Sequence, residues 1–277
     1  MDELTDEQVT ADVLSALTED VRDGDLTAEL IPELKSAKAQ VICRENAVFC
    51  GQRWFEEVFQ QLSDQVTVEF FVKDGDFVPE NTLICTLKGP ARSLLTGERS
   101  ALNFIQTLSG TATRSYQYAQ AVKTETKVLD TRKTIPGLRV AQKYAVKCGG
   151  CFNHRMGLYD AVLIKENHIE AAGSIAQAVR RSRSLFPDAK VEVEVENLAE
   201  LDQAMNAKAD IALLDNFSHQ QIKQAVELNQ GVLKLEVSGN VTIERLPELA
   251  VLGVDFISTG ALTKDLKSID FSMRFSQ

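Results

Sequence analysis

The chain has 277 residues and a formal net charge of −10, with the hydrophobic (44%) and charged (25%) fractions of an ordinary globular protein. Roughly 100–200 residues per domain allow one large domain or two modest ones. The negative charge argues against a nucleic-acid or anionic-membrane partner, no apolar run approaches the roughly 20 residues of a membrane span, and the acidic N-terminus is unlike a targeting segment, so we expect a soluble cytoplasmic protein.

The first block of the chain mixes helices and strands. Apolar residues recur every four positions near the N-terminus and predict an amphipathic helix that ends at "RDGD": Val9, Val13, Leu17 and Val21. The stretches "QVICRENAVFCG", "QVTVEFFVKDGDFV" and "TLICTLKG" predict strands, with a helix at "RWFEEVFQQL" and a hairpin turn at residues 73–76. We therefore predict an α+β domain at residues 1–112.

Beyond residue 112, short apolar strands alternate with helical segments such as "SIAQAVRRSRSLF" and "IKQAVELN". The predicted strands are "KVLDT", "AVLIK", "VEVEVE", "IALLD", "LKLEV" and "DFIST". This alternation is typical of βα units and a parallel sheet. Because the strands follow one another without a long break, we favour an open or incomplete α/β barrel at residues 113–269 over a doubly wound sheet. Six strands are too few for a closed eight-stranded barrel.

Polar residues follow almost every one of these strands, where α/β barrels carry their chemistry. They are Arg132 and Lys133, Lys165, Glu194 with Glu196, Asp215, Ser238, Gly239 and Asn240, and Thr259 with Gly260. A single cation after a strand is more often solvated surface, and the "VEVEVE" alternation also fits a half-exposed strand. In a parallel sheet that is buried on both faces, however, the glutamates need partners or a polar lumen.

The grouping of these charges suggests the kind of ligand. Two carboxylates facing several cations suit a substrate with phosphates and hydroxyls, with the acids holding Mg²⁺ or ribose oxygens and the cations meeting the phosphates. Glycines after the last two strands allow backbone N–H groups to approach an anion, as in the phosphate site of many barrels. Either glycine turn alone would more often be structural.

The window from Asp130 to His168 is basic although the chain is acidic, which suggests a small anionic ligand. Its seven cations, Arg132, Lys133, Arg139, Lys143, Lys147, Arg155 and Lys165, face three acids, Asp130, Asp160 and Glu166. In Asn153-His154-Arg155, the arginine can form a fork to a carboxylate and the histidine can donate a second hydrogen bond. A surface histidine beside a surface arginine would explain these three residues equally simply.

Arg99 lies within the apolar stripe predicted for the helix "LLTGERSALNFIQTL", four residues after Leu95 and three before Leu102. An arginine there either snorkels, forms a structural ion pair, or reaches a ligand or a partner chain.

The five cysteines fit a reducing compartment. We expect Cys43, Cys50 and Cys85 to behave as small buried hydrophobes. Cys148-x-x-Cys151 lacks a second cysteine pair or suitably spaced histidines, so a metal site there is disfavoured, and a redox role for the pair stays open.

Long motifs closely resemble the quinolinate phosphoribosyltransferase family. They are "GERSALNFIQTLSGTAT", "LDTRKTIPGLRVAQKYAVKCGG", "NHRMGLYDAVLIKENHI", "VEVEVENLAEL", "LLDNF", "LEVSGNVT", "GVDFISTGALTK" and the tail "IDFSMRF". The resemblance implies a type II phosphoribosyltransferase-like fold, with an N-terminal sandwich-like domain, on which the tail 270–277 packs, and an open seven-stranded α/β barrel. It implies the joining of quinolinate and phosphoribosyl pyrophosphate, with release of pyrophosphate and carbon dioxide, to give nicotinate mononucleotide for NAD synthesis. It also implies Mg²⁺ and a homodimer, or a higher oligomer, with shared active sites.

The resemblance carries roles to individual positions. Arg132, His154 and Arg155 resemble the pocket for the quinolinate carboxylates, with Thr131 as a further substrate-binding residue and Arg99 contributed by the neighbouring subunit. Lys133 and Lys165 resemble the groups that meet the phosphates. Glu194 and Asp215 resemble the acids that hold ribose hydroxyls and Mg²⁺, directly or through water or substrate, and Ser238, Gly239, Asn240 and Gly260 resemble the 5′-phosphate cradle. The departures, Cys151-Phe152 and Thr259, concern local packing.

Three alternatives stay open. One is a relative that acts on another pyridine or pyrimidine acid. Another is a Schiff-base lyase that uses Lys165, since a barrel strand end also presents an amine in such enzymes. The third is a carrier module, because "VKDGDFVPENTLICTLKG" has the strand and turn pattern of biotinyl and lipoyl domains, although it lacks a modifiable lysine at the hairpin tip.

Overall fold

The computed structural model describes residues 4–276, except for the side chain of Ser276. The chain divides into two compact units. The barrel unit contains Gln117–Lys133 and Cys151–Ala261. The sandwich unit contains the chain up to Tyr116, Thr134–Gly150 and the chain from Leu262 onward. Helix α3 (Ala91–Ala121) runs through the expected boundary at residue 112. Within the described residues, no helix is both long enough and apolar enough to span a membrane.

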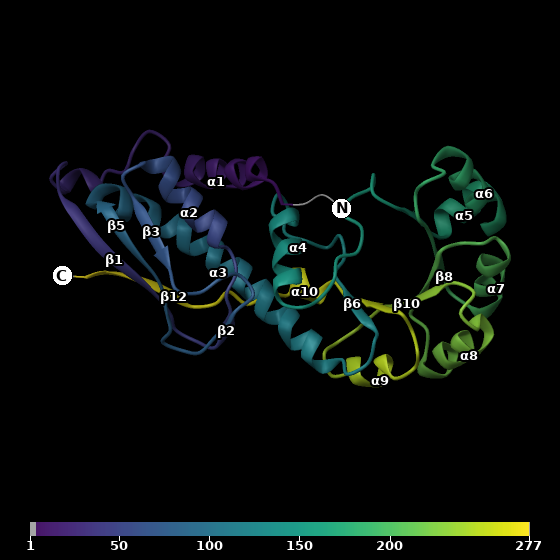
Figure 1. The fold of residues 1–277 in the computed structure, drawn as a ribbon. Coiled ribbons are helices and arrows are strands. Elements are labelled where there is room, and N and C mark those ends of the chain that lie inside the picture. Colours follow the sequence, from purple (N-terminus) through teal and green to yellow (C-terminus); the bar gives the residue numbers. More distant parts are fainter. Residues whose placement is uncertain (1–3, 277) are drawn as a thin grey trace. The chain divides into compact units, whose positions relative to one another are not determined.

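The sandwich unit is built on an antiparallel four-stranded sheet with the order β12-β1-β5-β3 (Figure 1). The C-terminal strand β12 pairs with the first long strand, β1. The strands are β1 (Ser36–Cys43), β3 (Thr67–Phe70), β5 (Leu83–Pro90) and β12 (Phe271–Ser276), with a separate two-stranded sheet of β2 (Ala47–Val48) and β4 (Phe77–Val78). The helices are α1 (Asp6–Asp20), η1 (Ala28–Leu30), α2 (Gln52–Leu62), α3 and α4 (Arg139–Cys148). Helix α10 (Ala261–Lys264) belongs to this unit from Leu262 onward.

The amphipathic patterns of this unit fold as expected. Helix α1 buries Val9, Val13 and Leu17, and its N-terminus is capped by Thr5, whose side chain accepts a hydrogen bond from the Gln8 N–H. These residues join one hydrophobic core with the aromatic face of α2 and the inner faces of β1, β5 and α3. Cys43, Cys50 and Cys85 are fully buried in that core, which confirms the prediction for them.

The predicted hairpin at residues 73–76 is wrong. Strand β3 pairs with β5, whereas β4 pairs with β2, so the turn connects two different sheets. The turn residue Asp74 caps helix α2: its Oδ1 accepts hydrogen bonds from the N–H groups of Gly51 (2.9 Å) and Gln52 (3.1 Å). Its Oδ2 accepts a bond from the Tyr144 hydroxyl (2.9 Å). These long-range bonds fix the turn, and the local sequence gave no sign of them.

The barrel unit contains a parallel sheet with the order β6-β11-β10-β9-β8-β7, which confirms the six predicted strands. They are β6 (Lys127–Leu129), β7 (Val162–Ile164), β8 (Val191–Val195), β9 (Ile211–Asp215), β10 (Lys234–Ser238) and β11 (Phe256–Ser258). A parallel bridge from Leu129 to Phe152 extends the sheet beyond β6, so the implied seventh strand is reduced, among the described residues, to one bridging residue.

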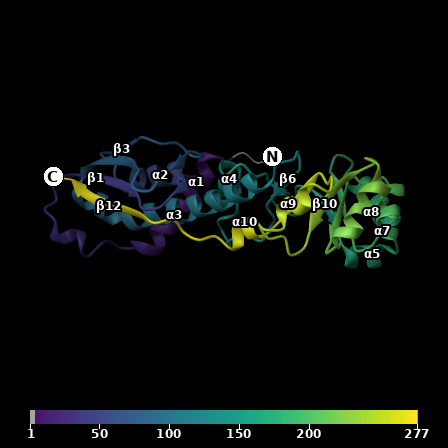
Figure 2. The ribbon, with the colours of Figure 1, turned by 90° about the horizontal axis from the view of Figure 1, so that it is seen from below.

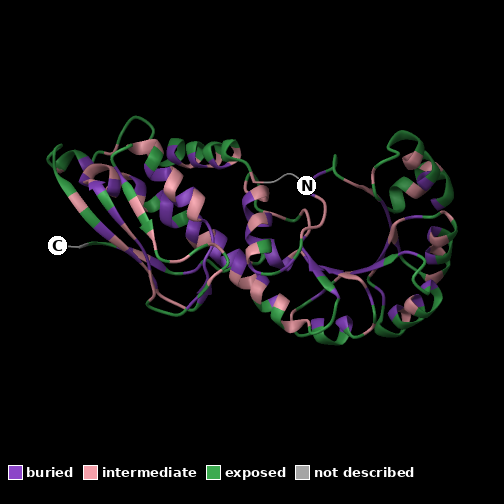
Figure 3. Cartoon of the chain, viewed as in Figure 1, coloured by how far each residue is buried: buried purple, intermediate pink, exposed green. Residues whose placement is uncertain are grey.

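Helices cover the outer face of this curved sheet (Figures 1 and 2). They are α5 (Glu166–Ala172), α6 (Ile175–Leu185), α7 (Leu198–Asn206), α8 (His219–Asn229) and α9 (Leu246–Ala250). Their exposed residues face outward and the strands are largely buried (Figure 3). Glu192 is only 3% exposed although it lies in β8 between fully buried valines, so this strand is buried on both faces. A buried glutamate in such a strand requires a polar partner.

Candidate active site

The strand register brings the predicted site residues of the barrel unit to one edge of the sheet. Ser238 of β10 is directly opposite Asp215 of β9, and Glu194 of β8 is opposite Leu213. Because all six strands run parallel, their C-terminal ends meet at this edge. Lys165 follows β7 there as the N-cap of α5, and Gly260 follows β11. The prediction that these polar residues share one edge is confirmed.

A lysine and a glutamate form an ion pair at this edge. The Lys165 Nζ is 2.5 Å from the Glu194 Oε2, and the two side chains are 46% and 18% exposed. The neighbouring acid, Asp215, accepts a hydrogen bond from the Asn216 side-chain amide (2.9 Å) and is half-buried. The edge therefore presents one cation and two carboxylates that solvent or a ligand can reach.

A tight glycine turn follows Ser238. Gly239 has φ of +98°, and a Cβ at that position would lie 2.2 Å from the Asn216 Oδ1, so a side chain is excluded. Asn240 also has positive φ, and its carbonyl accepts a hydrogen bond from Arg245 (2.9 Å). Here the glycine is required both by the backbone conformation and by the Asn216 side chain that lies against it.

Gly260 lies close to the loop after β6. A Cβ at Gly260 would meet the Lys133 Cδ at 3.0 Å and the Thr131 Oγ1 at 3.5 Å. The Thr131 hydroxyl in turn accepts the Lys133 N–H at 3.0 Å, which holds the first turn of that loop. The first and last strand ends of the predicted site are thus neighbours in space, although Lys133 and Gly260 are 127 positions apart in the sequence.

The positive charges of two arginines in the barrel unit, Arg132 and Arg155, interact unfavourably. The pKa of Arg155 is lowered, mainly by burial of its guanidinium and next by the positive charge of Arg132, whereas Glu192 and Asp160 oppose the shift. The Arg155 Nη1 donates to the Ala161 carbonyl (3.1 Å), which fixes its direction. Two half-buried guanidinium groups whose charges oppose each other suit an anion with more than one carboxylate.

Three buried acids of the barrel unit were not among the predicted site residues. Asp130 is fully buried, and its carboxylate accepts bonds from the His154 N–H (2.9 Å) and the Asn153 side-chain amide (2.6 Å). Glu192 and Glu236 lie 3.1 Å and 3.5 Å from the His154 Nε2. The available signal was a glutamate flanked by apolar residues in "VEVEV" and "LKLEV", which would have had to be interpreted as buried.

The electrostatics of this cluster are unusual. Burial, and next the charge of Glu192, raise the pKa of Glu236 from its ordinary value of 4.5 to about 7, while His154 and the Ser258 hydroxyl act in the opposite direction. Within the described residues, both oxygens of Glu236 and one of Glu192 are buried without a hydrogen bond of ordinary geometry. Glu236 therefore keeps its proton far more readily than an exposed glutamate.

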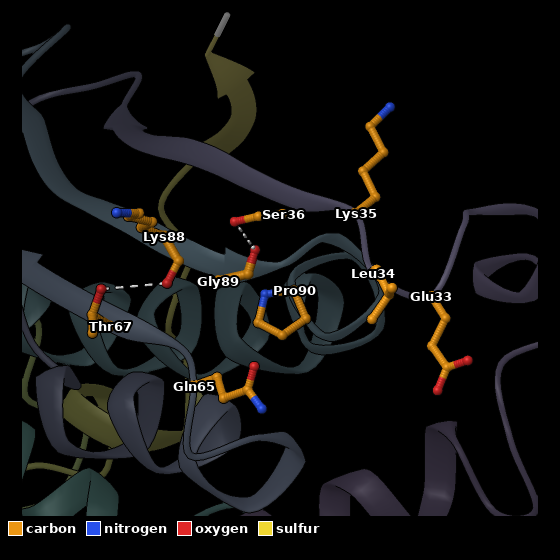
Figure 4. Close-up of a pocket in the computed structure, with 9 residues that line it drawn as sticks. All are labelled: Glu33, Leu34, Lys35, Ser36, Gln65, Thr67, Lys88, Gly89 and Pro90. Atoms are coloured by element: carbon orange, nitrogen blue, oxygen red, sulfur yellow. Dashed lines mark hydrogen bonds between the residues drawn. The ribbon is translucent and has the colours of Figure 1, made fainter.

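A separate hollow lies in the sandwich unit and contains none of the predicted site residues (Figure 4). Its polar groups largely satisfy one another: the Ser36 hydroxyl donates to the Gly89 carbonyl and the Thr67 hydroxyl to the Lys88 carbonyl. It offers no converging set of unpartnered polar groups, so the sheet edge of the barrel unit is the stronger candidate.

Comparison with known proteins identifies the family of this chain. The family model for the quinolinate phosphoribosyl transferase C-terminal domain matches residues 111–274, and the model for its N-terminal domain matches residues 25–109. The chain belongs to the quinolinate phosphoribosyltransferase family. A probable nicotinate-nucleotide pyrophosphorylase [carboxylating] from Bacillus subtilis is 41% identical over 92% of this chain and 89% of its own.

Solved structures of nicotinate-nucleotide pyrophosphorylases have the same fold as this family member. That from Francisella tularensis matches with a TM-score of 0.96 and 49% identity, covering 99% of this chain and 98% of its own. That from Ehrlichia chaffeensis matches with a TM-score of 0.92 and 37% identity, covering all of both chains. The predicted fold class, an N-terminal α+β sandwich-like domain with an open α/β barrel, is confirmed.

One expectation about this family member changes, and one residue that was left open gains a contact. Arg99 is exposed on α3, so it lies outside the buried stripe that contains Leu94 and Leu102, and its charge needs no buried partner within the chain. The thiol of Cys148 is hydrogen-bonded to Cys50, which lowers its pKa, although burial acts in the opposite direction. The contact of Cys148 with Cys50 relates it to the core of the sandwich unit rather than to a metal site.

Proposed function

We propose that the chain transfers the phosphoribosyl group of phosphoribosyl pyrophosphate to quinolinate and releases carbon dioxide, giving nicotinate mononucleotide and pyrophosphate for NAD synthesis. Family membership supports the reaction class, and the names of the similar proteins specify the pyridine nucleotide. The observation that carries the proposal is the pair of half-buried guanidinium groups, Arg132 and Arg155, beside a sheet edge lined with cations and carboxylates. Quinolinate is a dicarboxylate that such a pair would hold next to a polyphosphate.

The arginines and the lysines of the site have different roles in this reaction. Arg132 and Arg155 bind the carboxylates and orient the pyridine nitrogen toward the ribose. Lys133 and Lys165 offset the charge that develops on the departing pyrophosphate, as the ribose carbon becomes oxocarbenium-like. The pyridine nitrogen is itself the nucleophile, so no protein nucleophile is needed. Once it is quaternised, its positive charge stabilises the electron pair that stays on C2 when carbon dioxide leaves, and a proton from solvent then replaces the carboxylate at C2, so decarboxylation follows transfer.

The turns after the last strands suit the 5′-phosphate. Gly239 and Gly260 carry no Cβ, and Ser238 and Asn240 add polar side chains at the same edge. Backbone N–H groups that a side chain does not cover can approach phosphate oxygens closely. We infer that this turn cradles the phosphoribosyl group while the arginines hold the acid.

Glu194 and Asp215 fit a magnesium site. They supply oxygen ligands from adjacent parallel strands, both are partly accessible, and Mg²⁺ prefers carboxylate oxygens with several retained waters. When bound, Mg²⁺ would neutralise pyrophosphate charge and favour its departure. In this role Lys165, which is ion-paired with Glu194, holds that carboxylate at the sheet edge.

We further propose a homodimer with shared active sites. Arg99 is an exposed cation on a helix, so it is available to a second copy of the chain. The resemblance to the family assigns it to the neighbour's quinolinate pocket. A cationic side chain crossing a two-fold interface would complete each site from both subunits.

The alternatives are less well supported. The Lys165 amine is ion-paired with Glu194, whereas a Schiff-base lysine must react as the neutral amine. The carrier-module interpretation lacks a modifiable lysine at the hairpin tip, and the strands of its motif, β4 and β5, belong to two different sheets. A relative that acts on another pyridine or pyrimidine acid would be distinguished from the proposed enzyme by the acid that it turns over.

The deciding experiment is an assay of purified protein with quinolinate, phosphoribosyl pyrophosphate and Mg²⁺, in which ultraviolet absorbance follows formation of the mononucleotide. We expect turnover that depends on all three components. Borohydride added with a carbonyl substrate should not trap Lys165. Turnover of another pyridine or pyrimidine acid in preference to quinolinate would overturn the proposal.

A further inference from the structure

Both nitrogens of the His154 ring are engaged by the protein. The Nδ1 accepts a hydrogen bond from the backbone N–H of Arg155, the next residue, at 2.8 Å. The Nε2 lies 3.1 Å from the Glu192 Oε2 and 3.5 Å from the Glu236 Oε1. Glu192 is 3% exposed and Glu236 is fully buried, so these contacts are shielded from water. The ring is therefore held between one main-chain donor and two buried acids.

The contacts fix which ring nitrogen carries the hydrogen. A nitrogen that accepts an N–H bond has its lone pair occupied and cannot itself be protonated, so the hydrogen of the neutral ring is on Nε2. The Nε2–H then donates toward Glu192. An imidazolium would place a second N–H against the N–H of Arg155, which disfavours the charged ring.

This assignment decides against a metal site at the same three residues. The ligand atoms of His154, Glu192 and Glu236 lie within 4.8 Å of one another, and one imidazole with two carboxylates is a set that can bind transition metals. A metal would need the Nε2 lone pair, which the hydrogen occupies as long as Nδ1 holds the Arg155 N–H. The cluster is better explained as a hydrogen-bonded support.

The support acts on a short segment that carries the proposed substrate-binding arginine. Asp130 accepts the His154 N–H, the Nδ1 of His154 accepts the Arg155 N–H, and the Ala161 carbonyl accepts the Arg155 guanidinium. Glu192 also favours the charged form of Arg155 and so opposes the effects of burial and of Arg132. Asp130 and the His154 ring thus hold the backbone of this segment, and Glu192 favours the charge of the arginine.

We propose that Glu192 and Glu236 are positioning residues that hold His154 as the Nε2–H tautomer and thereby orient Arg155 for the substrate carboxylate. This inference rests on the proposed function for the identity of the substrate, and it departs from the expected role of His154. His154 acts through Arg155 and does not donate its own hydrogen bond to quinolinate. The direct contacts from this chain to the carboxylates are then made by Arg132 and Arg155.

The first arm of the test needs no activity. In protein labelled with ¹⁵N-histidine, long-range ¹H–¹⁵N spectra distinguish the two neutral tautomers and the imidazolium, and the chain has only three histidines. His154 is assigned by the signal that disappears in His154→Gln. We expect the Nε2–H tautomer at neutral pH. An Nδ1–H tautomer or an imidazolium in the wild-type protein would show that Glu192 and Glu236 do not hold His154 in the proposed way.

The second arm separates positioning from general structural damage. Glu192→Ala removes the acceptor, and we expect the KM for quinolinate to rise about tenfold or more, while the KM for phosphoribosyl pyrophosphate changes less than about twofold. Glu192→Gln retains a carbonyl acceptor and should recover most of the loss. Glu227→Gln, an exposed glutamate on α8, is the matched control and should behave as the wild type.

The outcomes separate this inference from the proposed function. Equal rises in both KM values, or an unchanged KM for quinolinate in Glu192→Ala, would overturn the positioning role. Should Glu192→Ala fail to fold, the wild-type tautomer and the Glu192→Gln kinetics still decide. If the wild-type protein does not use quinolinate at all, the proposed function fails, and the role of Arg155 toward that substrate fails with it. The tautomer measurement still tests whether Glu192 and Glu236 hold His154 as proposed.

Discussion

Replacing Glu236 by glutamine tests whether this buried carboxyl binds a proton at neutral pH. Its pKa is about 7 in the folded chain, against an ordinary value of 4.5, so the folded state holds a proton that the unfolded state has released between these values. The free energy of unfolding of the wild-type protein should therefore fall as the pH rises from about 4.5 to about 7, and stay low above that. At about 1.4 kcal/mol per pKa unit, the loss is about 3 kcal/mol.

Glu236→Gln has nearly the same shape and no proton to lose. Its stability relative to the wild type should therefore increase with pH, and the variant should be more stable by up to about 3 kcal/mol near pH 8. Urea unfolding of both proteins between about pH 5 and pH 8.5 measures this difference, with Glu227→Gln as the control for an exposed glutamate. A difference between Glu236→Gln and the wild type that stays constant over this range would refute the reasoning.

Four further predictions concern the proposed site. Nicotinate should be a very poor substrate because it lacks the second carboxylate, and equal turnover of nicotinate and quinolinate in the absorbance assay would defeat that interpretation. Glu194→Gln or Asp215→Asn should weaken Mg²⁺-dependent catalysis without unfolding the chain, so full activity over a Mg²⁺ titration would remove that carboxylate from the site. Arg99→Ala and Lys165→Ala should each be nearly inactive alone, but up to about one quarter of the active sites should recover when the two variants are refolded together. Half of randomly paired dimers are mixed, and each mixed dimer has one intact site. A mixture as inactive as its parents, despite demonstrated subunit exchange, would place Arg99 in its own chain's site. Gly239→Ala should cost about 1–3 kcal/mol of stability and raise the KM for phosphoribosyl pyrophosphate, because its φ of +98° excludes a side chain, and an unchanged melting temperature with an unchanged KM would show that the turn adapts.

The local sequence was sufficient for the strands of the barrel unit and for the edge at which its site lies. Each strand is a short apolar run followed by a helical period, and parallel strands necessarily place their C-terminal ends together. For that reason Lys165, Asp215 and Gly260 could be predicted to meet without knowledge of any side-chain contact. The sequence likewise predicted a glycine turn after the strand that ends at Ser238, whereas the need for glycine at position 239 came from the structure, where its φ is +98°.

Where a side chain finds its partner was decided only by the tertiary structure. The turn at Asp74 has a hairpin sequence, yet its carboxylate caps a helix that begins more than twenty residues earlier in the chain. Arg99 falls within an apolar pattern, but the packing of α3 leaves it exposed, because helical spacing alone does not say which flank of the stripe is covered.

The buried acids show the same limit most clearly. Alternation in "VEVEVE" is compatible with a half-exposed strand and with a strand buried on both faces, and the letters are identical in the two cases. Glu192 became a support for His154 only because β8 lies inside a curved parallel sheet, with Glu236 brought in from β10. The sequence determined which residues carry charge. The burial and long-range pairing that set the pKa of Glu236 and the tautomer of His154 depend on residues far apart in the chain, and only the folded structure brings these together.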